Sequence, residues 1–526
     1  MDITLWILII GWIFVFLWVP FIIYTNRKTH PKALFILFFA EMWERFSYYG
    51  MRALLVLYMT KVLFIDFAQN IAETKAYAIY GSYTAMVYLF PVVGGLVADK
   101  LLGFRKTIIW GGFLMVLGHF TLGIQGIEGI EGSMSLFFTA LALIIVGNAF
   151  FKPNISSFLG TFYEMDDPRK DGAFSIFYMG VNIGSFLSML TCGYVGQNIN
   201  WHYGFGLAGI GMLVGLLVFW LYSKKFGEKG LPPREVIEGK VKLLGIKPDF
   251  SIIILSLLAV PVCAFMLDLN ELMSSILLLV SLFIISYLLY IALTAKDKIV
   301  GQRLLVVIIL FFFHAIFWAL FEQAGGSITI FTDKNVDRFV GGTELPAAIF
   351  QSFNPLFIML LAPLFSFMWI RLRKKRIEPN TPMKFVLGLA QLALGFGIIV
   401  LGAKYFANDN GLVSVVFLAF MYLFHTTGEL SLSPVGLSMV TKLSPGKIVG
   451  FVMGAWFLSI SVGNKLAGWI GGLTASKDVD ENTPATETLS IYADTYLIWG
   501  VFVVLGAVLL LLLLVPVLKK WMHGIH

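Results

Sequence analysis

The stretch FFAEMWERFSYYGMRALL, residues 38–55, places charged side chains inside an otherwise apolar run. The apolar run ALFILFFA (33–40) overlaps the beginning of this stretch, and the apolar run ALLVLYMT (53–60) overlaps its end. At about 100° per residue, one face of a helix here carries Glu41, Arg45, Tyr48 and Arg52, with Glu44 at its edge. A charge at the bilayer centre costs about 2.5–3.5 kcal/mol. We therefore predict a membrane helix whose charged face turns away from lipid.

The composition indicates a polytopic membrane protein. Of 526 residues, 58% are hydrophobic and 13% are charged, whereas soluble domains have about 45–50% and about 25%. The net charge of +7 does not indicate nucleic acid, because the basic residues gather in short loops between apolar segments. Cys192 and Cys263 both lie in apolar segments, which argues against a disulfide framework or a metal site.

The apolar segments predict an all-α protein with fifteen membrane spans, since a spanning helix needs about 20 apolar residues. Alternating strands typical of a membrane barrel are absent from the sequence. The predicted spans are 3–24, 33–63, 77–100, 104–125, 134–160, 172–195, 203–223, 251–268, 273–294, 302–330, 346–370, 383–404, 411–440, 448–473 and 493–518.

Loop charges predict the orientation in the membrane. The loops 24–32, 167–171, 223–230 and 371–376 are basic and would lie on one side. The loops 126–133 and 477–490 are neutral or acidic and would lie on the other. Basic loops face the cytoplasm, so we expect a multi-pass protein of the inner (cytoplasmic) membrane with its C-terminus inside and its N-terminus outside.

The order of the spans predicts four segments. Residues 1–26 form an extra N-terminal helix, and residues 33–223 form a six-helix bundle. Residues 224–300 are a linker with two further helices, and residues 301–521 form a second six-helix bundle. Six plus six helices are typical of transporters that bind substrate between two halves.

Several motifs resemble those of the proton-dependent oligopeptide transporters, bacterial type, within the major facilitator superfamily. EMWERFSYYGMR resembles the family's ExxER signature. Further similar stretches follow in the family's order: GGLVADKLLGFRK (94–106), FFKPNIS (150–156), FSIFYMGVNIGSF (174–186), FNPLFIMLLAPLF (353–365) and GELSLSPVGLS (428–438). The resemblance covers about residues 33–520. It implies the major facilitator fold; the helix at 3–24 departs from the usual fourteen-helix pattern.

The resemblance implies a symporter that imports di- and tripeptides with protons by alternating access. It implies no cofactor, the proton being the coupling ion. The residues support this independently, because a zwitterionic peptide needs a cation for its carboxylate and an anion for its amine. Arg52 and Lys152 are expected to bind the carboxylate, and Glu429 the amine. The other expected substrate-binding residues are Tyr48, Tyr49, Tyr88, Asn182, Trp318, Asn354, Ser433 and Trp456.

Proton coupling needs a carboxylate whose pKa differs between conformational states. The candidates for this coupling are Glu41, Glu44, Arg45, Lys152 and Glu322. Which carboxylate takes the proton stays open. The histidines His119, His314 and His425 are interpreted as packing or hydrogen-bonding residues.

Three other functions would require different residues from those of a peptide importer. A relative that carries nitrate or another small anion would not need Glu429 as an amine receptor. A drug–proton antiporter would lack the ExxER face and the Lys152 and Glu429 anchors. An intramembrane enzyme would need a GxGD motif or a Ser–His pair, which the sequence does not offer. We expect a non-enzymatic monomer in the lipid bilayer that binds peptides and protons, without metal or nucleic acid.

Overall fold

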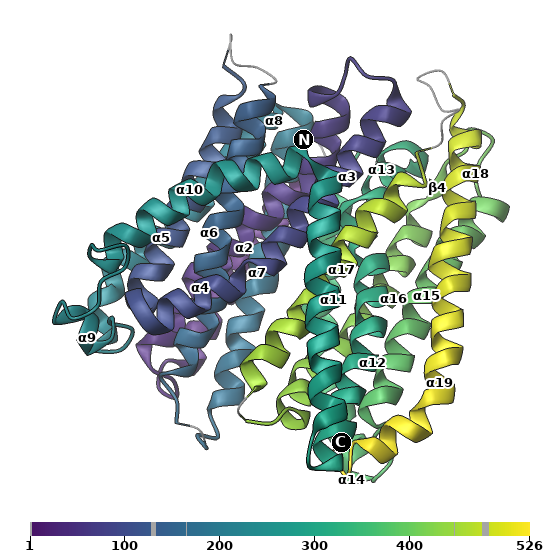
Figure 1. Ribbon diagram of the computed structural model, residues 1–526. Helices are drawn as coiled ribbons and strands as arrows, with labels where there is room; N and C mark the ends of the chain where they lie inside the picture. The colour runs from purple at the N-terminus through teal and green to yellow at the C-terminus, as the bar shows by residue number, and fades with distance from the viewer. Residues whose placement is uncertain (1–2, 128–132, 165, 447, 476–482, 526) are drawn as a thin grey trace. The chain divides into compact units, whose positions relative to one another are not determined.

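The computed structural model describes residues 3–127, 133–164, 166–446, 448–475 and 483–525 (Figure 1). All fifteen predicted spans are helical over most of their described residues. Thirteen helical runs are long and apolar enough to cross a membrane. The counts differ because Gln69–Ile124 forms one run of 56 residues and because the charged helix from Lys32 to Tyr58 is not among the thirteen. Parts of the predicted loops 126–133 and 477–490 lie outside the described residues.

The chain divides into two compact units, which are described separately. Unit 1 comprises Met1–Leu63, Leu89–Leu269 and Phe339–Pro355. Unit 2 comprises Phe64–Tyr88, Asn270–Arg338 and Leu356–His526. The four segments predicted from the sequence stay a prediction.

Unit 1 is helical apart from one short hairpin. Its α-helices are α1 (Ile3–Asn26), α2 (Lys32–Tyr58), α4 (Pro91–Val97), α5 (Gly103–Ile124), α6 (Met134–Gly160), α7 (Lys170–Asn198), α8 (Trp201–Tyr222), α9 (Arg234–Ile237) and α10 (Pro248–Asp268). The π-helical turns η1 (Met59–Leu63) and η2 (Ala98–Leu102) and the 3₁₀ turns η3 (Ser223–Phe226) and η5 (Ala347–Ser352) complete it. The hairpin pairs β2 (Phe339–Val340) with β3 (Thr343–Glu344) in antiparallel fashion.

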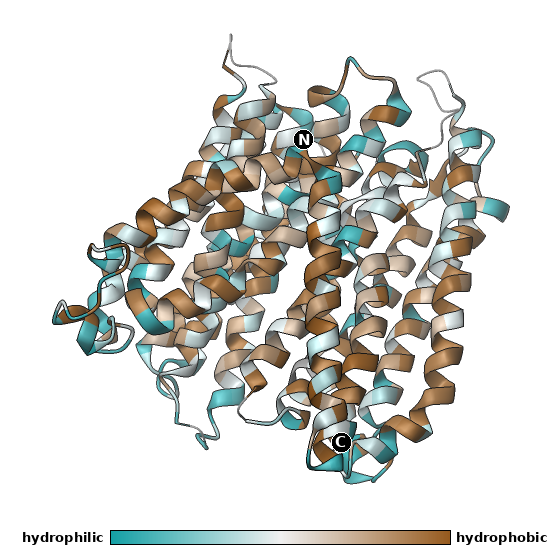
Figure 2. Cartoon of the chain, viewed as in Figure 1, coloured by the Kyte–Doolittle hydropathy of each residue, from teal (hydrophilic) through white to brown (hydrophobic). Residues whose placement is uncertain are grey.

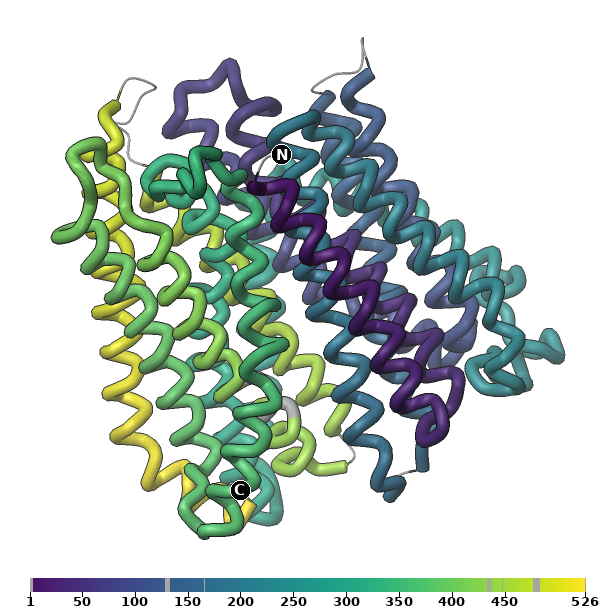
Figure 3. Tube along the Cα trace, turned by 180° about the vertical axis from the view of Figure 1, so that it is seen from behind, coloured from purple at the N-terminus to yellow at the C-terminus, as the bar shows by residue number. Residues whose placement is uncertain are grey.

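Close helix contacts in unit 1 depend on small residues. α2 packs along α7 and α8, and a Cβ at Gly184 would lie 2.0 Å from the Met42 carbonyl oxygen. Helices approach this closely only where a side chain is missing. α1 lies along α7 (Figure 3), where the Trp12 Nε1 donates to Thr191 Oγ1 at 3.0 Å. The extra helix is therefore attached to the same helix that packs on the charged α2.

Unit 2 contains the remaining helices. These are α3 (Gln69–Leu89), α11 (Asn270–Thr294), α12 (Lys298–Phe321), α13 (Ser327–Asn335), α14 (Phe353–Lys374), α15 (Thr381–Tyr405), α16 (Val415–Leu443), α17 (Val449–Gly472), α18 (Ala485–Thr495) and α19 (Val504–Trp521), the ends of α3 and α14 extending past the unit's limits. Between them lie the 3₁₀ turn η4 (Glu322–Gly325) and the π-helical run η6 (Tyr496–Val503). β1 (Val336–Asp337) pairs with β4 (Val413–Ser414) in parallel.

Two features of unit 2 position its polar residues. α12 ends at Phe321, and the 3₁₀ turn η4 leads into α13, so Glu322 stands where one helix stops and the next begins. Hydrophobic residues cover most of α11 and α19, whereas hydrophilic residues gather in the loops and at a few interior positions (Figure 2).

Candidate functional site

A buried cluster of charges lies on α2. The Arg45 Nε is 2.8 Å from Glu41 Oε1 and 2.8 Å from Glu44 Oε2. Glu44 is fully buried, and the other two side chains are about 5% exposed. The charged face therefore turns into the protein, as the sequence predicted. Glu44, expected only at the edge of that face, is a full partner of Arg45.

α6 contributes two polar residues to the surroundings of Glu44. The Asn148 Nδ2 donates to Glu44 Oε1 at 3.3 Å. Lys152 lies one turn further along α6, is partly buried, and is close enough to Glu44 for an electrostatic interaction. Asn148 was missed by the sequence analysis. The signal for it was its spacing of four residues from Lys152, which puts both on one helix face.

Arg52 continues the polar face of α2 by two further turns. Its guanidinium carbon lies 5.4 Å from the centre of the Tyr49 ring, within cation–π range. The Tyr48 and Tyr49 rings meet edge to face at 5.2 Å. A planar guanidinium binds a carboxylate through two parallel hydrogen bonds, so this cation has the chemistry that a peptide C-terminus requires.

The two asparagines predicted to bind substrate lie in unit 1. The Asn182 Nδ2 donates to the Tyr178 carbonyl of its own helix, α7, at 2.9 Å. Asn354 lies in the first turn of α14 and is partly exposed. The substrate-binding roles of both asparagines stay predictions.

The two predicted tryptophans in unit 2 are joined by a histidine. The Trp318 Nε1 donates to His314 Nε2 at 2.8 Å, and the His314 ring stacks on Trp456 at 4.3 Å. The other ring nitrogen of His314, Nδ1, lies 2.6 Å from Ser459 Oγ. His314 therefore both packs and hydrogen-bonds, as interpreted from the sequence, and it fixes the orientation of both indoles.

The structure places the other predicted residues of unit 2 on three elements. Glu322 opens η4 and is 2% exposed. Tyr88 near the end of α3 and Glu429 within α16 are both partly buried. Ser433 belongs to α16, but its side chain lies outside the described part of the structure.

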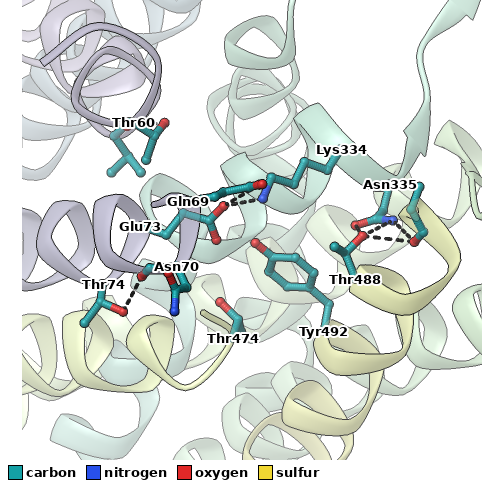
Figure 4. Close-up of polar contacts among 12 residues, drawn as sticks. Thr60, Gln69, Asn70, Glu73, Thr74, Lys334, Asn335, Thr474, Thr488 and Tyr492 are labelled. Atoms are coloured by element: carbon teal, nitrogen blue, oxygen red, sulfur yellow. Dashed lines mark hydrogen bonds and ion pairs between the residues drawn. The ribbon is translucent and has the colours of Figure 1, made fainter. Parts of the chain in front are cut away.

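A second charged pair, in unit 2, was missed by the sequence analysis (Figure 4). Glu73 of α3 forms an ion pair with Lys334 of α13, and the Gln69 Nε2 donates to the same carboxylate at 3.1 Å. Tyr77, one turn along α3 from Glu73, shares a hydrogen bond with Tyr492 at 3.3 Å. The predicted spans 77–100 and 302–330 stopped short of both charged residues, which therefore looked like loop residues.

Chemically, the two charged sites differ from a metal centre. Within the described ranges, no three His, Cys, Asp or Glu residues are grouped as metal ligands. The α2 cluster instead offers two carboxylates that share one guanidinium in a site shielded from water. Such a site can bind a proton, because neutralising one carboxylate leaves the other paired.

The long apolar helices, with a buried charge cluster on α2 and a buried ion pair between α3 and α13, define a polytopic membrane protein with internal polar sites. A sequence profile described as the POT family matches residues 105–489. The chain belongs to this family, as its motifs suggested. It is a family of transporters, and the comparisons give no support to an enzymatic function.

The relatives agree over nearly the whole chain. The peptide transporter YePEPT of Yersinia enterocolitica is 37% identical, with 93% of this chain and 94% of the relative covered. The dipeptide and tripeptide permease A of Proteus mirabilis is 34% identical, with 94% and 96% covered. A crystal structure of a peptide transporter POT in complex with sulfate has a TM-score of 0.78 at 34% identity, with 94% and 96% covered. The predicted fold class is thereby confirmed.

Proposed function

We propose that this protein is a symporter that imports di- and tripeptides together with protons. The observation that carries the proposal is the buried cluster in which Glu41 and Glu44 share Arg45. The names of the related transporters, which refer to peptides, support the substrate class. Transport of nitrate or drugs finds no comparable support.

We propose that the peptide binds with a defined polarity. Arg52 and Lys152 receive its carboxylate, and Glu429 receives its amine. The support is chemical: these charged side chains lie on membrane-spanning helices, where a charge is costly without a function. Tyr48, Tyr49 and Tyr88 supply hydroxyl groups for the peptide backbone, and Trp318 and Trp456 supply aromatic surfaces for side chains.

The α2 cluster gives the proton a role in the proposed transport cycle. With both carboxylates ionised, Arg45 holds Glu41 and Glu44 together. Protonation of one carboxylate weakens its ion pair and makes Lys152 or Arg45 available to another partner. A proton then favours one conformation over the other by the difference in its binding energy between the two. Glu322 at the break between α12 and α13 is the proposed second carboxylate of this coupling.

The experiment is uptake into proteoliposomes of purified protein. We expect a labelled dipeptide to accumulate when the lumen is made alkaline, and excess unlabelled dipeptide or tripeptide to compete. Free amino acids, nitrate and a cationic drug should not compete. Accumulation of nitrate, or peptide uptake that ignores the pH gradient, would overturn the proposal.

We also propose that the protein acts as a monomer in the inner membrane. We propose that its C-terminus is cytoplasmic, because basic loops face the cytoplasm and the predicted spans place the C-terminus on the side of the basic loops. The test introduces single cysteines at Lys225 and at Asn408, in loops predicted to lie on opposite sides of the membrane, and treats intact cells with a membrane-impermeant thiol reagent. We expect label at position 408 only. Labelling at position 225 and not at position 408 would show that the protein has the opposite orientation.

A further inference from the structure

A groove of about 660 Å³ lies on unit 1 between α5, α8 and α10. Its lining residues come from the end of η2, the first half of α5, the second half of α8 and the beginning of α10. The groove therefore sits near one end of these helices. It is separate from the charged cluster of α2, none of whose residues lines it.

The mouth of the groove carries one cation and one anion. The Lys106 Nζ lies 2.8 Å from each carboxylate oxygen of Asp249. The side chains are 52% and 39% exposed, so a ligand can reach both charges. A partly exposed ion pair contributes little to stability, and a ligand with its own positive and negative groups can take its place at small cost.

The rest of the groove is apolar and aromatic. Phe113, Leu217 and Trp220 line it and are each more than 40% exposed. Trp110 is held against α10 by a hydrogen bond from its Nε1 to Ser256 Oγ at 2.9 Å. From Lys106 to Phe113 the wall of α5 extends about 10 Å along the helix axis. This combination of a charged mouth and a long apolar wall fits a headgroup with an attached acyl chain.

We propose that this groove binds a zwitterionic aminophospholipid, phosphatidylethanolamine. Its phosphate would contact Lys106, its ammonium would contact Asp249, and one acyl chain would lie along Trp110, Phe113 and Leu217. Basic residues in pockets between membrane helices bind the phosphates of lipid headgroups such as cardiolipin, and Lys106 would bind the phosphate here in the same way. Asp249 decides the class of lipid, since an acidic lipid would bring a second negative charge towards it, and a choline headgroup has no N–H to donate.

The test is lipid binding to the full-length purified protein by native mass spectrometry. Phosphatidylethanolamine, phosphatidylcholine and phosphatidylglycerol with identical acyl chains are compared. We expect phosphatidylethanolamine to bind about tenfold more tightly than phosphatidylcholine, equivalent to one charge-assisted hydrogen bond. Asp249→Asn should remove this preference, and Lys106→Gln should weaken the binding of both lipids.

Matched controls separate the groove from general surface charge. Lys225→Gln and Glu235→Gln remove one exposed charge each from outside the groove and should change nothing. Lys106→Arg keeps the cation and should retain lipid binding. Leu217→Trp should fill the groove and therefore weaken the binding of all three lipids. Thermal unfolding identifies any variant that fails to fold. Tighter binding of phosphatidylglycerol, strengthened by Asp249→Asn, would overturn the proposal, as would equal binding of all three lipids.

Discussion

The charged cluster of α2 and the Glu73–Lys334 pair of unit 2 both neutralise buried carboxylates with a cation, but they differ in the number of carboxylates per cation. On α2, Glu41 and Glu44 share one guanidinium, whereas Glu73 has one ammonium group as its ion-pair partner. Removing either charge of a buried one-to-one pair leaves the other charge buried without compensation. Two carboxylates on one cation keep a pair when one of them is protonated. We therefore propose that α2 carries the proton site and expect the Glu73–Lys334 pair to be a structural contact.

The largest expected effect breaks the α2 cluster. Glu44→Gln mimics permanent protonation, so peptide accumulation driven by a pH gradient should be abolished while counterflow exchange of peptide survives. Proteoliposome uptake and counterflow measure the two directly. Asn148→Ala removes a neighbouring hydrogen bond without changing charge, so it should retain accumulation at a reduced rate. Wild-type accumulation by Glu44→Gln would remove this residue from the coupling.

The next effect concerns the cation further along α2. Arg52→Ala should weaken the binding of a dipeptide with free termini by about 10- to 150-fold, since a charge-assisted hydrogen bond contributes about 1.5–3 kcal/mol. The loss should be much smaller for a C-amidated dipeptide, which carries no carboxylate. Glu429→Gln should likewise weaken the binding of the dipeptide with free termini, and it should have a much smaller effect on an N-acetylated dipeptide, which carries no ammonium group. Competition binding with the three ligands on purified protein tests both, and equal losses for all ligands would contradict the proposed polarity.

A smaller effect is expected at the one-to-one pair. Breaking a buried ion pair costs about 3–5 kcal/mol, and we expect about 2 kcal/mol here because the Lys334 side chain is 22% exposed. Glu73→Gln and Lys334→Gln should each lower the melting temperature, and the double variant should lose less than their sum.

The double variant should still accumulate peptide against a proton gradient, which distinguishes this pair from the α2 cluster. If Glu73→Gln abolished accumulation and left the melting temperature unchanged, the roles assigned to the two charged sites would have to be exchanged.

The smallest effect lies in the loop between α14 and α15. A hydrogen bond from Arg373 holds the pKa of Glu378 at about 2, and Lys384 also lowers it. Because this pKa is lower than the unfolded value of about 4.3, the stabilisation is present above that pH and is lost as pH falls towards 2. Glu378→Gln should lower the melting temperature by about 1 °C at pH 7. The difference should shrink below pH 4, and Glu235→Gln, an exposed carboxylate of α9, is the control.

Much of the membrane architecture could be predicted because it depends on composition along the chain. Runs of about 20 apolar residues need a helix to satisfy their backbone in lipid, and the fifteen predicted spans are helical. The helix boundaries were less accurate. α3 begins at Gln69, eight residues before the predicted 77, because polar residues such as Glu73 are buried against other helices.

The candidate site was predictable where its residues share one helix. The spacing of Glu41 and Arg45 places them one turn apart, and their ion pair follows from helix geometry. Contacts between helices were not predictable in this way. Asn148 and Glu44 are 104 positions apart, and Lys334 and Glu73 are 261 apart.

The sequence by itself determined that this protein is a bundle of membrane helices with one strongly charged face on residues 38–55. Hydropathy and helical period are local properties, and each residue contributes to them regardless of its distant neighbours. Only the tertiary structure decided that Asn148 donates to Glu44, that His314 joins Trp318 to Trp456, and that Lys106 meets Asp249 beside an apolar groove. Those contacts depend on which helices pack together and at which depth, and packing is set by shape complementarity between surfaces far apart in the chain.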